Sequence, residues 1–141
     1  MQHRLTPLVF ATLGSLVLLT ACDTAPVREP KTTRTIFLHV DRPSPDVEIG
    51  LVSAIRVVLP GPAPGSGLLW EIASNNTRVL EQMGPMKAEA AAEEAGSRPA
   101  TTVSFYTLKP GRSALRFYLL DPKLAEAVPS ATCELTVRVV D

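Results

Sequence analysis

The sequence predicts an all-β domain, a β-sandwich of about seven short strands, and three observations indicate this fold class. Apolar residues make up 45% of the 141-residue chain, and they occur in short runs where apolar and polar side chains alternate, as in strands with one buried face. Thirteen prolines and eight glycines supply turns between these runs. The runs follow one another closely over residues 35–141, which is the spacing typical of a sandwich.

The expected strands occupy residues 35–40, 51–59, 68–73, 77–83, 101–108, 114–120 and 132–140. In the first of them, Ile36, Leu38 and Val40 share one face, while Phe37 and His39 point to the other. Residues 41–46, with two prolines, are expected to form a turn.

Two residues are expected in the core. Trp70 is the only tryptophan, and sandwiches of this kind place a tryptophan between their sheets. Cys133 alternates in phase with Leu135, Val137 and Val139, so its thiol is predicted to be buried, where it acts as a small apolar group.

Residues 85–95 do not fit the strand pattern. They are rich in alanine and glutamate, which are among the best helix formers. Pro85 stands at the start and Gly96 follows the end, which is the asymmetry of helix termini. This segment is therefore predicted to be a short surface helix or a helical loop.

The N-terminal residues 1–21 are predicted to be an export signal. Arg4 precedes an apolar stretch over residues 5–19, which is shorter than the ~20 residues that a membrane span needs. The stretch closes on Leu19, Thr20, Ala21 and Cys22, a tetrapeptide that resembles the lipobox of bacterial lipoproteins.

The lipobox resemblance implies that cleavage leaves Cys22 as the new N-terminus, with a diacylglyceryl group on its thiol. The membrane is then a partner through this lipid, and the domain is expected in the cell envelope, facing the periplasm, on either the inner or the outer membrane. Residues 22–34 are poor in apolar side chains and contain two prolines, so they are interpreted as a flexible tether before a domain over residues 35–141.

Several function classes are excluded. Fourteen basic residues balance fourteen acidic ones, so the chain lacks the basic excess that nucleic-acid phosphates require. No His, Cys or acidic residues have the spacing of a metal site, and no glycine-rich phosphate loop precedes a helix. With Cys133 buried and His39 the only histidine after the signal, no catalytic group can be assembled. The chain is predicted to have no catalytic residues, no metal and no cofactor.

From Ile55 onward the order of strands and turns resembles that of the chagasin family of cysteine-protease inhibitors, which are small immunoglobulin-like β-sandwiches. A β-branched strand ends in Leu59-Pro60, a Pro- and Gly-containing loop follows, and the next strand bears Trp70. The features that follow also keep the order of the family. They are a glycine-containing loop, a strand, a turn and the closing strand, at Ala95-Gly96-Ser97, residues 101–108, Lys109-Pro110-Gly111 and the C-terminal end.

The resemblance implies that three loops at one end of the sandwich bind in the cleft of a papain-like cysteine protease. The corresponding residues are Gly61, Pro62, Ala63, Pro64, Gly65, Ser66, Gly67, Leu68, Gly96, Ser97, Asp121 and Pro122. The first loop lacks the paired threonines of the family, and only a proline remains of its Arg-Pro-Trp. The alternative is a structural or assembly lipoprotein that binds another envelope protein and has no inhibitory activity.

Overall fold

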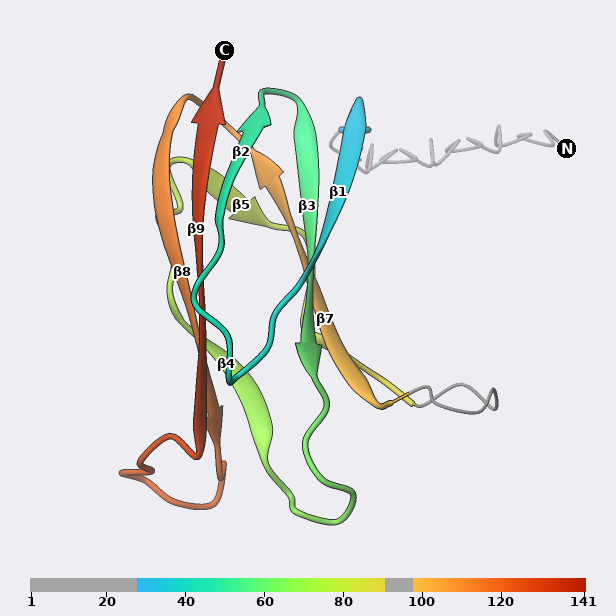
Figure 1. Ribbon diagram of the computed structural model, residues 1–141, viewed down its shortest axis with the longest axis vertical. Helices are drawn as coiled ribbons and strands as arrows, with labels where there is room; N and C mark the ends of the chain where they lie inside the picture. The colour runs from blue at the N-terminus through green and yellow to red at the C-terminus, as the bar shows by residue number, and fades with distance from the viewer. Residues whose placement is uncertain (1–27, 91–97) are drawn as a thin grey trace, which may run out of the picture.

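The computed structural model describes residues 28–90 and 98–141, which form two facing β-sheets (Figure 1). The strands are β1 Thr32–Phe37, β2 Asp46–Gly50, β3 Ser53–Pro60, β4 Leu69–Ser74, β5 Leu80–Gln82, β6 Lys87–Glu89, β7 Ala100–Thr107, β8 Gly111–Leu120 and β9 Ala131–Val140. The all-β sandwich predicted from the sequence is confirmed.

The strands divide between a five-stranded and a four-stranded sheet. The first has the order β1-β3-β7-β5, with β6 also paired to β7, and the second has the order β2-β9-β8-β4. Two pairings are parallel, β1 with β3 and β2 with β9. The chain therefore crosses from one sheet to the other between β1 and β2, and both strands lie at edges on the same side of the sandwich (Figure 1).

The core is filled by alternate side chains of the long strands. Ile55, Val57 and Leu59 on β3 have no exposed surface, and Val137 on β9 has none either. The rings of Phe105 and Phe117, from opposite sheets, meet edge to face with their centroids 6.5 Å apart, an arrangement that suits the charge distribution of aromatic rings. Trp70 and Cys133 are both buried, as predicted.

The strand β2 was not expected from the sequence. Asp46 was assigned to a turn, and residues 47–50 to no element, because the segment contains only two apolar side chains between charged residues and a glycine. Val47 and Ile49 point inward and are buried, while Asp46 and Glu48 are exposed. Pairing with β9 at Val47↔Val137 and Ile49↔Val139 makes this short segment a strand.

The helix prediction for residues 85–95 is wrong over Lys87–Glu89, which form β6. These residues pair with the start of β7, Ala88 opposite Thr101, so tertiary pairing overrides the local preference for helix. Residues 91–95 lie outside the described part of the chain. The strand expected over residues 77–83 is reduced to β5, Leu80–Gln82, because residues 77–79 form a turn.

The first strand is shifted toward the N-terminus relative to its prediction. It begins at Thr32, inside the expected tether, and ends at Phe37, so Val40 lies outside it and is 46% exposed rather than inward-facing. Pairing with β3 extends from Thr32↔Ser53 to Phe37↔Val58. A segment with few apolar residues thus becomes a strand because an edge position requires little burial.

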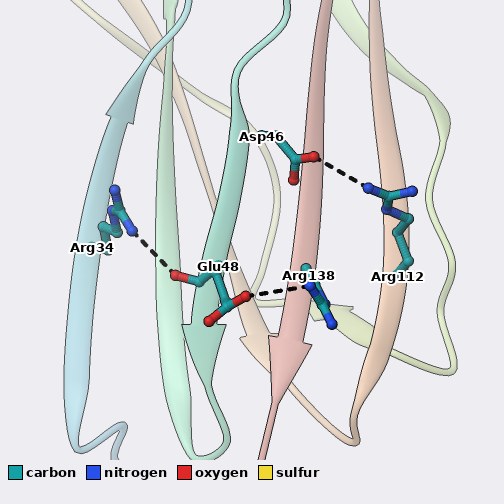
Figure 2. A network of polar contacts seen from close by, with 5 residues as sticks. All are labelled: Arg34, Asp46, Glu48, Arg112 and Arg138. Atoms are coloured by element: carbon teal, nitrogen blue, oxygen red, sulfur yellow. Dashed lines mark hydrogen bonds and ion pairs between the residues drawn. The ribbon is translucent and has the colours of Figure 1, made fainter.

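Polar contacts connect the edge strands β1 and β2 (Figure 2). Arg34 on β1 donates from Nη1 to the backbone oxygen of Glu48 on β2 at 3.2 Å, and the Glu48 carboxylate lies 3.6 Å from Arg138 on β9. Arg112 on β8 pairs with Asp46 at 3.2 Å. All these side chains are exposed, so each pair contributes ~1 kcal/mol or less. The Arg34–Glu48 bond joins the two sheets along one side, whereas the two ion pairs lie within the four-stranded sheet.

The two ends of the sandwich differ. β1 begins beside the first residue of β3, and the C-terminus lies at this same end (Figure 1). The connection between β3 and β4 lies at the opposite end (Figure 1). The chain therefore enters the domain at the end remote from this loop.

Candidate functional site

Two loops lie at the same end of the sandwich, which we call the loop end (Figure 1). They are the β3–β4 loop, residues 61–68, and the β8–β9 loop, residues 121–130. Both were predicted from the sequence to belong to one binding surface. Of the third predicted loop, Gly96 and Ser97 lie outside the described residues, but Pro99, two residues later, contacts the β3–β4 loop.

The base of the β3–β4 loop is held by two hydrogen bonds. The Gly61 amide donates to the Pro99 oxygen at 2.8 Å, and Trp70 Nε1 donates to the Pro60 oxygen at 2.7 Å. Gly61 is required for the first contact, since a Cβ there would lie 2.6 Å from Pro99 atoms, including backbone. The loop therefore leaves the sandwich in a fixed direction.

The tip of the β3–β4 loop has a turn of its own. The Ser66 amide donates to the Ala63 oxygen at 3.1 Å, and the Leu68 amide donates to Ser66 Oγ at 3.3 Å. Gly65 and Gly67 have φ values of 75° and 72°, which glycine adopts without strain. Because the tip residues are exposed yet internally bonded, less conformational entropy is lost when a partner binds them.

The β8–β9 loop is also ordered locally. The Lys123 amide donates to Asp121 Oδ1 at 3.0 Å, and the Leu124 amide donates to the Asp121 oxygen at 3.1 Å. This loop displays two apolar side chains, since Leu124 is 61% and Val128 86% exposed. Asp121 and Pro122 were the residues of this loop predicted to bind. Leu124 and Val128 were not predicted, although apolar side chains in an exposed loop are a signal for a contact surface.

Cys133 and His39, the two side chains weighed as catalytic groups in the sequence, lie on different elements. No group of three or more His, Cys, Asp or Glu residues that could hold a metal ion occurs in the part of the chain that is described. Cys133 faces the core at 3% exposure, and burial raises the pKa of its thiol, which disfavours the reactive thiolate. His39 is exposed in the connection after β1.

Among the titratable groups of residues 28–90 and 98–141, one other has a clearly shifted pKa. Hydrogen bonds to Tyr118 and Glu134 raise the pKa of Arg116, whose Nε lies 2.6 Å from Glu134 Oε1. This pair lies on the exposed face of the four-stranded sheet and serves cross-strand pairing, because Arg116 and Glu134 are register partners of β8 and β9.

The predicted lipobox residues Leu19, Thr20, Ala21 and Cys22 lie outside the described residues. Within residues 28–90 and 98–141, no helix is long and apolar enough to cross a membrane.

Comparison with family models and with curated protein sequences finds no match to the chain. Solved structures do resemble it. The cysteine protease inhibitor EhICP2 from Entamoeba histolytica is 15% identical and superimposes with a TM-score of 0.60, over 77% of this chain and 96% of its own. Amebosin is 19% identical, with a TM-score of 0.52 over 79% of this chain and 99% of its own.

These likenesses confirm a chagasin-like, immunoglobulin-like β-sandwich fold.

Proposed function

We propose that this chain is a lipid-anchored, extracytoplasmic inhibitor of papain-like cysteine proteases, which inserts its β3–β4 loop into the protease cleft. One observation carries the proposal: an exposed loop, bonded at its base to Trp70 and Pro99, projects from one end of a chagasin-like sandwich. The fold is shared with EhICP2, a cysteine protease inhibitor, at low sequence identity.

The inhibition would be steric. Residues 63–67 form the exposed tip and contribute no nucleophile beyond the Ser66 hydroxyl, whose oxygen already accepts from Leu68 N. Pro62 and Pro64 restrict the backbone of the loop. The β8–β9 loop would contact one wall of the cleft through Leu124 and Val128, and the segment around Gly96 would contact another.

A titration tests this function. The full-length chain, purified in a nonionic detergent, is added to papain and residual peptidase activity is measured. We expect stoichiometric inhibition at submicromolar concentration. Absence of inhibition at micromolar concentrations would remove this function and favour the alternative, a structural or assembly lipoprotein.

A matched pair of variants assigns the inhibition to the loop. Ala63→Glu places a charge at the exposed tip without removing a side-chain contact, and we expect at least a tenfold increase in the inhibition constant. Lys109→Glu changes an exposed turn beyond the far end of β7, and we expect less than a twofold change. Equal effects of both variants would place the binding surface elsewhere.

The lipid anchor is the second part of the proposal and rests on the sequence of Cys22 and the residues before it. The entry of the chain opposite the loop end supports it, because a membrane tether attached there leaves the loops pointing outward. The sandwich itself separates the two ends by the length of a strand such as β9, whose ten residues span about 33 Å at ~3.3 Å each.

Mass spectrometry of the protein isolated from membranes tests the anchor. We expect a chain that begins at Cys22 and carries diacylglyceryl mass on that residue. An uncleaved chain, or a mature chain with an unmodified Cys22 thiol, would contradict it. Separation of the two membranes before the measurement would show which of them carries the protein.

A further inference from the structure

An exposed aromatic residue lies beside the loop end, outside the loops considered so far. Phe37, the last residue of β1, is 65% exposed. Its backbone position is fixed by its pairing with Val58 and by the bond from the Leu38 amide to the Val58 oxygen at 2.9 Å. A large aromatic side chain is thus held in solvent on a rigid strand end, where its burial by a partner would remove much apolar surface from water.

Phe37 stands between two hollows of the surface. Phe37, Leu38 and His39, which we call the Phe37 ridge, line both a groove of about 430 Å³ and a second one of about 400 Å³. The rest of the first groove is lined by residues 58–60 at the end of β3, by residues 61–64 and by residues 98–100. Half of the β3–β4 loop therefore also lines this groove, so the groove is contiguous with the proposed binding surface.

The titratable side chains that line the two grooves are mostly basic. Arg98 and His39 line the first groove, and no carboxylate does so among its described residues. Arg42 lines the second groove together with Glu134, whose carboxylate is already bonded to Arg116 at 2.6 Å. A partner that offers a carboxylate beside an apolar side chain would match this surface in charge as well as in polarity.

We propose that the Phe37 ridge is a second contact surface for the protease of the proposed function. It would bind a protease surface loop outside the catalytic cleft that presents an apolar side chain next to an acidic one. The proposal rests on the proposed function, and it supplies the interface residue types that the β3–β4 loop lacks. The β3–β4 loop contains no aromatic residue and no arginine, the types that usually dominate interface energies, whereas Phe37 and Arg98 supply both beside it.

The test measures the inhibition constant of full-length variants against papain in detergent. We expect Phe37→Ala to raise the constant at least tenfold, and Phe37→Leu to raise it less because an apolar side chain remains. The control is Leu108→Ala, which truncates a 36% exposed apolar residue beyond the end of β7, remote from the loop end, and should change the constant less than twofold.

A second variant tests the charge. Arg98→Glu should slow association severalfold at low salt, and the difference from the unmodified chain should shrink as salt is added. Urea unfolding of each variant excludes loss of the fold as the cause, since both changed side chains are exposed.

The outcomes separate the two proposals. If the unmodified chain inhibits but Phe37→Ala and Arg98→Glu leave the constant within twofold, the ridge proposal is overturned and the proposed function stands. If the unmodified chain does not inhibit, the proposed function fails and the ridge loses its partner.

Discussion

Trp70 on β4 donates a hydrogen bond of 2.7 Å to the backbone oxygen of Pro60, the last residue of β3. The two strands belong to different sheets, so this single bond crosses the sandwich where the β3–β4 loop begins. Trp70 is only 6% exposed. The residue that fills the core beneath the loop is therefore also the residue that fixes the start of the loop.

Trp70→Phe is expected to lower both stability and inhibition. The variant keeps an aromatic ring, but the Pro60 oxygen loses its donor and a small cavity forms beside the smaller ring. Together these effects lower the unfolding free energy by about 1–3 kcal/mol. Urea unfolding followed by circular dichroism measures this loss. Leu69→Ala, at a 55% exposed neighbour, is the control and should cost less than about 0.5 kcal/mol. Equal losses would show that the bond has no role.

Gly61→Ala is expected to separate the β3–β4 loop from β7. The new methyl would lie 2.6 Å from Pro99 atoms, so the backbone must move and the Gly61–Pro99 hydrogen bond weakens. We expect a loss of about 1–3 kcal/mol, measured by urea unfolding. Gly50→Ala is the matched control, because a Cβ at Gly50 meets nothing within 4 Å. Equal stability of the two variants would show that the loop accommodates a side chain at residue 61.

Cys133 should make stability depend on pH in the alkaline range. Burial raises the pKa of its thiol above the ordinary value of 9.0, so above about pH 9 the unfolded chain releases this proton while the folded chain retains it. The stabilisation is complete below the unfolded pKa and is lost as the pH rises through the folded pKa, with a slope of at most ~1.4 kcal/mol per pH unit.

Urea unfolding between pH 7 and 11 measures this dependence, with Cys133→Ala as the reference for all other titrating groups. The unmodified chain should lose more stability across this range than the variant does. Identical pH profiles would mean that the thiol is not protected by the fold.

Thr107 is expected to contribute a buried polar link at the far end of the sandwich. Its Oγ1 accepts from the Ser53 amide at 3.0 Å and lies 3.2 Å from the Ser53 oxygen. Thr107→Val keeps the shape but leaves the buried Ser53 amide without a partner, which costs about 1–3 kcal/mol. Thr132→Val, at an exposed position on β9, should change the urea midpoint little. A neutral Thr107→Val would show that the amide finds another acceptor.

The strands that could be predicted are those whose alternation is long enough to be unambiguous. In the ten-residue strand β9, Cys133, Leu135 and Val137 alternate with polar residues, and both the strand and its buried face follow from that pattern. β2 has only Val47 and Ile49, too few for a period to emerge. β6 was taken for helix because the alanine and glutamate around it favour helix locally, and only its pairing with β7 reverses this.

Part of the candidate site could also be predicted from the sequence, and part could not. The β3–β4 loop could be located from its prolines and glycines, because Gly65 and Gly67 are needed at positive φ. The alternation in the first strand also placed Phe37 opposite the core face. That Phe37 lies beside this loop could not be predicted, because it depends on the parallel pairing of β1 with β3, which brings residues 37 and 58 together across a long stretch of chain.

The central claim is that the loop end occupies the cleft of a papain-like protease, and binding to papain with an open and with a blocked cleft tests it most directly. The dissociation constant of the full-length chain is measured for active papain and for papain whose catalytic cysteine carries a covalent substrate-like inhibitor. The account predicts at least a hundredfold weaker binding to the blocked enzyme. Equal affinity for both forms would contradict it.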